Sequence, residues 1–252
     1  MKNPAISFHN LTLGYDRHPA VHHLSGEIAR GELLAIVGSN GAGKSTLLKA
    51  IAGELRSLSG QLDLHGNGKL DIAYLPQIVD IDRSFPISVF DCAAMGLWRE
   101  IGALRGLDAR QESRVLGALE SVGLAGLAER SVGALSGGQF QRVLFARLFL
   151  QDAKIILLDE PFRAVDARTV ADLVQLIGRW HSEGRTVLAV LHDIDQVRAH
   201  FPHTLLLARE VLAWGETPSV LTPANLDQSR RFTEGHDSHA AICERDEVRE
   251  SA

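Results

Sequence analysis

Apolar residues along this chain gather in short uninterrupted runs separated by glycine and polar residues. Runs over 6–13, 33–37, 61–64 and 72–75 have the length of β-strands. The run at 33–37 is wholly apolar, which is typical of a strand buried on both faces in a parallel sheet. Residues 5–80 therefore predict several short strands and one helix, arranged as a mixed β-subdomain built against the core.

The pattern changes between about 86 and 132, where the strand character is lost. Apolar residues recur there at helical spacing. They are Phe90, Met95, Leu97, Trp98, Leu116, Leu119 and Val122. We expect a helical subdomain in which the methionine and the aromatic positions form core rather than a ligand site.

From 140 to 208 the pattern alternates between helix and strand three times, which predicts parallel strands joined by crossover helices. The residues after 232 are polar and charged and include few large apolar side chains. We therefore expect an α/β fold with one domain over 1–232, its helical subdomain at about 86–132, and a mobile tail over 233–252.

A glycine-rich loop follows the wholly apolar run. It matches the pattern G-x-x-x-x-G-K-[ST] without a mismatch and reads Gly38, Ser39, Asn40, Gly41, Ala42, Gly43, Lys44, Ser45, Thr46. Glycines allow successive N–H groups to converge on phosphate oxygens, and the helix that follows adds the positive end of its dipole. We expect Lys44 to reach the β and γ phosphates and Ser45 to ligate Mg²⁺. The loop therefore predicts binding of a nucleoside triphosphate with Mg²⁺.

A second motif consists of four apolar residues followed by Asp159 and Glu160. A buried parallel strand that ends in acids points to a site, because ligands collect at the carboxyl ends of such strands. Many strands end in solvated acids, and the loop upstream is what favours a catalytic interpretation. We expect Asp159 to approach Mg²⁺ and Glu160 to orient and polarise the attacking water.

With these motifs the chain resembles the ATP-binding subunits of ABC transporters, over roughly residues 5–225. The most diagnostic segment follows Leu135 and resembles the signature of that family: Ser136, Gly137, Gly138, Gln139. The resemblance implies a P-loop NTPase core in which these four residues contact the γ-phosphate of ATP bound to a partner subunit. A serine hydroxyl, two unobstructed glycine N–H groups and a helix start suit such an anion.

Four further residues carry over by the same resemblance. Gln77 resembles the Q-loop glutamine, which senses Mg²⁺ and couples the nucleotide to the membrane partner, and His192 resembles the switch histidine that contacts the γ-phosphate. Asp166 resembles the D-loop aspartate at the dimer interface, and Tyr15 the aromatic residue that stacks on adenine. A histidine or tyrosine at the end of a strand often has only a structural role. For His192, the neighbouring motifs favour a functional role.

The sequence departs from the commonest family pattern after the catalytic acid, where it reads Glu160-Pro161-Phe162-Arg163. Glu-Pro-Phe resembles the branch that serves zinc, manganese and iron importers. The resemblance thus implies a Mg²⁺-dependent ATPase subunit of a divalent metal importer, with zinc favoured over manganese. The alternatives are an importer of haem or iron-siderophore and, less favoured, a non-transport ABC ATPase. The last class usually has a second cassette or a long coiled coil, which this sequence lacks.

Composition bears on the partners. A formal net charge of −5 has the wrong sign for general nucleic-acid binding. No apolar stretch approaches 18 residues and the first residues lack a secretory core, so we expect a peripheral protein at the cytoplasmic face of the membrane. The resemblance implies a homodimer through the nucleotide sites, an integral-membrane permease and, indirectly, an extracytoplasmic metal-binding protein.

The tail contains His236, His239 and Cys243, spaced as a soft metal ion would need on a helix. Three ligands do not close a structural zinc site, which favours a solvated tail. The second cysteine of the chain, Cys92, lies far away in sequence, and a disulfide is not expected in a reducing compartment.

Overall fold

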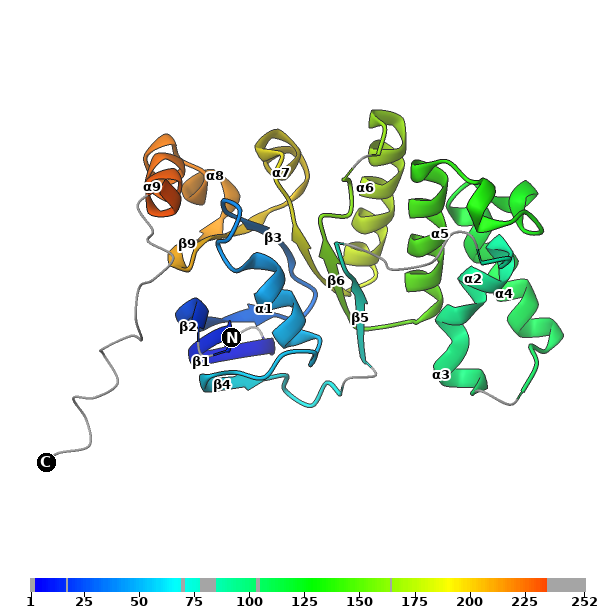
Figure 1. Cartoon of the computed structure of the whole chain (residues 1–252), viewed down its shortest axis with the longest axis horizontal. Coiled ribbons are helices and arrows are strands. Elements are labelled where there is room, and N and C mark those ends of the chain that lie inside the picture. The colour runs from blue at the N-terminus through cyan, green and yellow to red at the C-terminus, as the bar shows by residue number, and fades with distance from the viewer. Residues whose placement is uncertain are drawn as a thin grey trace, which may run out of the picture.

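The computed structural model describes residues 3–16, 18–68, 71–77, 85–102, 105–163 and 165–234. It has a larger lobe built around two sheets and a smaller lobe of helices beside it (Figure 1). The predicted α/β fold class, with a parallel sheet, an antiparallel sheet and a helical part, is confirmed.

The central sheet has six strands in the order β5-β6-β7-β3-β8-β9, with β9 antiparallel to β8 and the others parallel. The strands are β3 (Leu33–Val37), β5 (Ile72–Leu75), β6 (Ile155–Asp159), β7 (Thr186–Val190), β8 (His203–Ala208) and β9 (Glu210–Glu216). Because β6, β7 and β3 are parallel neighbours, the segments that follow them emerge at one edge of the sheet. That edge receives the glycine-rich loop, the two acids and His192.

Alternate residues of the buried strands face two separate cores, as the two-residue period of a strand requires. Leu34 and Ile36 of β3 belong to the core that contains α1 (Lys44–Ile51) and the antiparallel sheet. Leu33 and Ala35 belong to the core that contains α6 (Ala167–Ser182) and α7 (Ile194–His200). Figure 1 shows α1 below the sheet and α6 and α7 above it. All five residues of β3 are buried, which explains its wholly apolar sequence.

The second sheet is antiparallel and has the order β2-β1-β4, formed by β1 (Pro4–Tyr15), β2 (His18–Ala29) and β4 (Ser59–Asp63). The hydrophobic pattern did not predict β2. Its buried residues Val21, Leu24 and Ile28 are not evenly alternating, because the pairing of β1 with β2 has several shifts in register.

The helical lobe contains α2 (Val89–Ala94), α3 (Trp98–Ile101), α4 (Ala109–Ser121) and α5 (Gly137–Leu150). The prediction that the methionine and aromatic positions here form core was wrong for two side chains, since Met95 is 38% and Trp98 59% exposed. Leu116 is also exposed, at 46%. A 3-10 turn over Met95–Leu97 changes the phase between α2 and α3, so Leu97 is buried while Met95 and Trp98 are exposed. On α4 the buried face is taken by Val115, Ala118 and Leu119.

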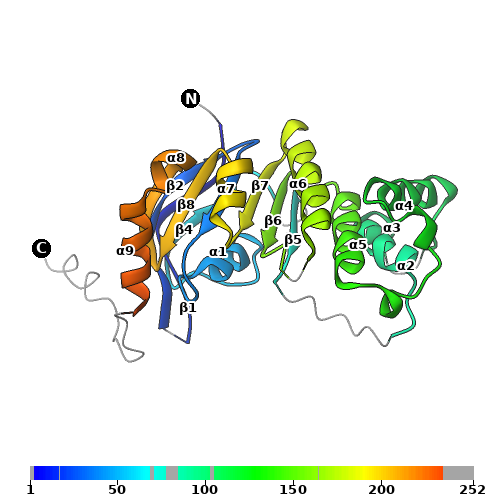
Figure 2. The same cartoon turned by 90° about the horizontal axis from the view of Figure 1, so that it is seen from above.

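The last two helices of the described residues, α8 (Thr217–Val220) and α9 (Pro223–Glu234), pack at the β8–β9 edge, and α9 is the leftmost helix in Figure 2. Helix α9 runs two residues past the predicted domain boundary at 232. The rest of the expected tail, with His236, His239 and Cys243, lies outside the described residues. Within the described segments, no helix combines the length and the apolar character that a bilayer span needs.

Candidate functional site

The glycine-rich loop joins β3 to α1, and its glycines are required by geometry. Gly41 and Gly43 have φ of 81° and 92°, a region that favours glycine. A Cβ on Gly43 would lie 2.4 Å from Cγ2 of Val21 and 2.6 Å from the carbonyl oxygen of Ala20. Gly43 caps α1 without a side-chain hydrogen bond, so the first N–H groups of the helix remain available to an anion.

Lys44 is buried and its ammonium folds back over the loop. Nζ donates hydrogen bonds of 2.8 Å to the carbonyl oxygens of Gly38 and Ser39. Burial lowers the pKa of Lys44, although the nearby carboxylates of Glu160 and Asp159 act in the opposite direction. A phosphate could replace the two carbonyls and would supply the negative charge that burial makes favourable.

Asp159, the last residue of β6, is 2% exposed and meets two hydroxyl groups. Ser45 Oγ donates to Asp159 Oδ1 at 3.0 Å, and the Tyr74 hydroxyl lies 3.5 Å from Oδ2. Burial is the main influence that raises the pKa of Asp159, and the charge of Glu160 adds to it. A serine hydroxyl beside a carboxylate provides the hard oxygen ligands that Mg²⁺ prefers, so this pair fits the expected ion.

Glu160 follows β6 with φ of 50°, an uncommon value for a residue with a side chain. Its N–H donates to the carbonyl of Val190 in β7, and its Oε1 lies 2.6 Å from Nε2 of His192. Burial raises the pKa of Glu160, but the hydrogen bond and charge of His192, with smaller contributions from Gln77 and Arg163, outweigh it and lower the pKa below its usual range. The carboxylate is therefore ionised at neutral pH and can accept a hydrogen bond from water.

A pocket of about 480 Å³ brings these groups together. It is lined by residues 40–46 of the loop, Gln77, Glu160, Arg163 and His192, which come from segments up to about 150 positions apart in the sequence. Arg163 was not predicted as a site residue, although the departure from the family pattern at this position was a signal. Its Nη1 lies 3.7 Å from Glu160 Oε2. Tyr74 was missed entirely, because nothing in the sequence indicates its contact with Asp159.

Tyr15 does not line this pocket. Its side chain is 47% exposed, and Lys49 Nζ lies 6.0 Å from the centre of its ring. The ring thus lies exposed on the surface near α1, beside Lys49, and stacking on adenine stays a prediction.

The signature segment also lies away from the pocket of its own chain. Ser136 caps α5: its Oγ accepts from the N–H of Gln139 at 3.2 Å, and Gln139 Oε1 accepts from the N–H of Ser136 at 3.0 Å. Asp166 caps α6 in a similar way through Thr169. The contacts predicted for Ser136, Gly137, Gly138, Gln139 and Asp166 therefore need a second chain.

Known proteins resemble this chain in sequence and in structure. The sequence model of the family described as ABC transporter matches residues 21–163. The zinc transport system ATP-binding protein TroB of Treponema pallidum is 39% identical over 222 residues, covering 86% of this chain and 84% of the relative. The manganese transport system ATP-binding protein MntB of Listeria monocytogenes is 37% identical over 221 residues, covering 86% and 92%.

Among solved structures, a putative metal-chelate type ABC transporter in an inward-facing conformation superposes with a TM-score of 0.81 at 32% identity, covering 91% of this chain and 90% of that chain. A nucleotide-free ATP-binding cassette from an ABC transporter has a TM-score of 0.79 at 20% identity, which supports the fold alone.

Proposed function

The chain belongs to the ABC transporter family, and on that premise we propose that it is the ATP-hydrolysing subunit of an importer for a divalent metal ion. One observation carries the ATPase part of this proposal. The phosphate-binding loop, Glu160 and His192 line a single pocket, and Asp159 at the end of β6 is joined to that loop through the hydroxyl of Ser45. The names of the relatives at 36–39% identity carry the metal-ion part.

In the proposed reaction the loop binds the phosphates of ATP through its N–H groups and through Lys44. The Lys44 ammonium would give up its hydrogen bonds to the carbonyls of Gly38 and Ser39 and donate to the β and γ phosphates instead. Only this one side chain has to move within the pocket. Burial of Lys44 strengthens this contact, because the effective dielectric constant is lower than in water.

Ser45, Asp159 and Gln77 are the residues that would hold Mg²⁺. Bound there, the ion would neutralise charge on the β and γ phosphates. The Ser45–Asp159 hydrogen bond holds both oxygen ligands in place before any ion binds, and Tyr74 fixes the second oxygen of Asp159.

Glu160 is the residue proposed to orient the attacking water. Its backbone is anchored to β7 through the carbonyl of Val190, and its carboxylate is held by His192. His192 also lines the pocket and is proposed to contact the γ-phosphate. Most of the catalysis would come from positioning and from neutralising charge, since phosphoryl transfer needs little covalent chemistry from the protein.

We propose that two copies of the chain form the complete site. The signature segment of each copy lies away from its own pocket at the N-terminus of α5, where it can cover ATP held by the partner. Binding of ATP would close the homodimer, and hydrolysis would let it open.

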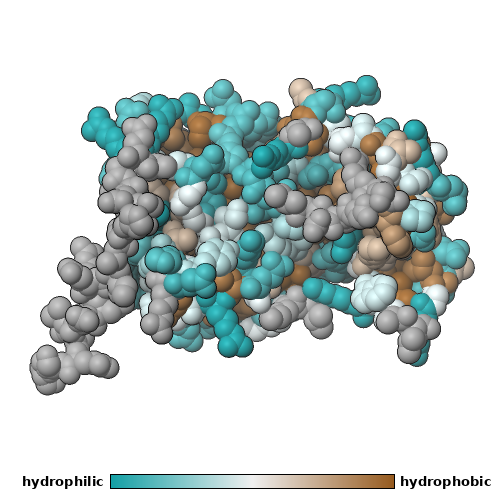
Figure 3. Space-filling model, in the orientation of Figure 1, coloured by the Kyte–Doolittle hydropathy of each residue, from teal (hydrophilic) through white to brown (hydrophobic). Residues whose placement is uncertain are grey.

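ATP-binding subunits of ABC importers work with membrane permeases, and the helical lobe offers a surface for one. A groove of about 310 Å³ is lined by Met95, Trp98, Ile101 and Leu107, with Asp91 among the polar residues at its rim. Figure 3 shows apolar residues gathered in this region, over α2 and α3. We propose that the permease docks here, which would place the chain at the cytoplasmic face of the membrane and link it indirectly to an extracytoplasmic metal-binding protein.

For the cargo we propose zinc ahead of manganese, with support from Glu160-Pro161-Phe162 and from the relative named for zinc. The relatives named for manganese make that ion the competing outcome of the same experiment. The likeness to a putative metal-chelate transporter supports a second candidate, import of haem or iron-siderophore.

The test uses proteoliposomes that contain the purified complex of this chain with its permease. ATP and Mg²⁺ should drive uptake of radioactive zinc, and Glu160→Gln should abolish it, whereas the matched surface change Glu183→Gln should not. Uptake of manganese alone would correct the cargo, and uptake of a ferric chelate alone would favour the second candidate. Failure to hydrolyse ATP in any of these complexes would overturn the proposed function.

A further inference from the structure

Two helices begin at the segments proposed to face the nucleotide of a second chain. Helix α5 in the helical lobe begins directly after its N-cap Ser136, and α6 in the larger lobe begins directly after its N-cap Asp166. They stand side by side in both views (Figures 1 and 2). The contact between these two helices therefore sets the position of the signature segment relative to Asp166.

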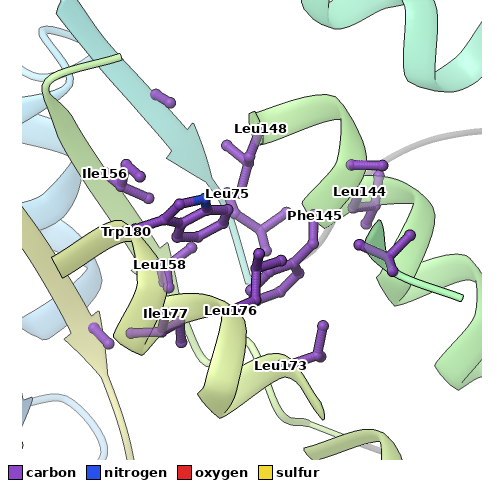
Figure 4. Packing of buried hydrophobic residues seen from close by; sticks show 14 of the residues in the cluster. Leu75, Leu144, Phe145, Leu148, Ile156, Leu158, Leu173, Leu176, Ile177 and Trp180 are labelled. Carbon is purple, nitrogen blue, oxygen red and sulfur yellow. The ribbon is translucent and has the colours of Figure 1, made fainter. Parts of the chain in front are cut away.

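Most of the contact between α5 and α6 is apolar. The rings of Phe145 and Trp180 stack with their centres 5.6 Å apart and their planes 8° from parallel. Figure 4 shows Leu148 of α5 and Leu176 and Ile177 of α6 packed around this stack. Apolar contact stabilises the pair but is not directional, so by itself it leaves the helices able to turn or slide against each other.

The end of this contact nearest the signature is polar and depends on Arg142. Its Nη2 donates to Asp172 Oδ2 at 2.7 Å and to Thr169 Oγ1 at 3.3 Å, and its Nη1 donates to the carbonyl of Val122 at 3.1 Å. The side chain is 18% exposed. A guanidinium group has fixed donor directions, so these bonds set the orientation of α5 relative to α6 and to the end of α4.

The same hydrogen bonds continue to the D-loop aspartate. Thr169 Oγ1 donates to Asp166 Oδ2 at 2.8 Å while it accepts from Arg142. Gly138 of the signature packs directly on this pair: a Cβ built on it would lie 3.1 Å from Asp166 Oδ2 and 3.2 Å from Thr169 Oγ1. Signature, aspartate and Arg142 thus form one continuous surface within a single chain.

We infer that Arg142 is a positioning residue that locks the signature segment and Asp166 into one rigid surface for docking on the nucleotide of the partner chain. Arg142 does not line the ATP pocket of its own chain, so it acts through residues 136–139 and Asp166. The inference rests on the proposed two-chain site. In this inference, Arg142 holds residues 136–139 and Asp166 in the relative position that the two-chain site needs.

The experiment measures ATP-driven dimerisation by analytical ultracentrifugation in the hydrolysis-deficient Glu160→Gln background. Adding Arg142→Ala should raise the protein concentration at half-dimerisation by about tenfold, because charge-assisted hydrogen bonds that orient the lobes are lost. Arg142→Lys should give an intermediate value, since lysine keeps the charge without the fork. The affinity of the dilute monomer for a fluorescent ATP analogue should not change.

Arg114→Ala is the matched control. Arg114 pairs with Glu100 at 2.5 Å, but both residues lie in the helical lobe and the pair does not join it to α6. This variant should dimerise as the parent does. If Arg142→Ala loses its helical circular dichroism and so fails to fold, Asp172→Asn replaces it in the dimerisation assay. This variant keeps the arginine but weakens its shortest hydrogen bond, and it should also dimerise more weakly than the parent.

Equal dimerisation of the parent, Arg142→Ala and Asp172→Asn would overturn the inference and leave the two-chain site standing. A parent that stays monomeric with ATP and Mg²⁺ would overturn the two-chain site, and the role of Arg142 with it. Weaker binding of the analogue by the Arg142→Ala monomer would also overturn the inference, because the effect would then lie within one chain.

Discussion

Nε2 of His192 lies 2.6 Å from Oε1 of Glu160, which joins the second residue after β7 to the first residue after β6. The glutamate is 13% and the histidine 44% exposed, so the carboxylate is held inside the pocket while the imidazole reaches its opening. Because β6 and β7 are parallel neighbours, their ends bring the two side chains together without any further loop structure.

Glu160→Gln should lower the rate of ATP hydrolysis by about 10²-fold or more, since an amide cannot take up a proton from the attacking water. Binding of ATP should persist, because Glu160 does not belong to the phosphate-binding loop. Phosphate release and ATP binding measured on the same preparation check both points. A variant that hydrolyses ATP at the parental rate would show that another group positions the water.

His192→Ala should move the acid limb of the pH–rate profile to higher pH. Glu160 acts as a carboxylate, so the rate falls as pH drops through its pKa. Burial raises this pKa and His192 is the strongest of the groups that lower it, so removal of His192 raises it. The variant therefore loses activity at a pH where the parent is still active. His181→Ala on α6 is the control and should leave the limb in place.

Gly43→Ala should destabilise the fold and weaken ATP binding. The backbone at this position has φ of 92°, and the added methyl group would overlap Val21 and the carbonyl of Ala20. Strain of this kind costs about 1–3 kcal/mol, before the clash is counted.

Gly117→Ala in α4 is the matched control for that change. A Cβ there meets nothing within 4 Å, and alanine should stabilise the helix by about 0.5–1 kcal/mol. Chemical denaturation of both variants tests the pair, and equal stabilities would contradict the account of the loop.

Trp98→Ala should weaken association with the permease while leaving ATP binding by the free chain unchanged. The side chain is 59% exposed in the apolar groove of the helical lobe, so its removal should not open a cavity in the core. Leu116→Ala is the control, because Leu116 is also exposed on this lobe but does not line the groove. Copurification with the permease provides the measurement. Equal loss in both variants would place the docking surface elsewhere.

The elements whose signals are contiguous in sequence could be predicted from it alone. Strands over 33–37 and 72–75 have the predicted bounds, and the alternation of helices and strands between 140 and 208 is as expected. A wholly apolar run shows burial on both faces directly, and a phosphate-binding loop needs glycines at fixed local spacing. For the same reason Lys44, Ser45, Asp159 and Glu160 could be identified as candidates before their positions in space were known.

Contacts between distant segments were decided only by the tertiary structure. Strand β2 depends on its register with β1, and the exposure of Met95 and Trp98 depends on a single 3-10 turn that shifts the helical phase. The hydrogen bonds from Tyr74 to Asp159 and from Arg142 to Asp172 could not be predicted from the local sequence pattern around either partner. Periodicity reports which side of an element is apolar, whereas a directional bond across 30 or 85 positions exists only after packing has brought its two ends together.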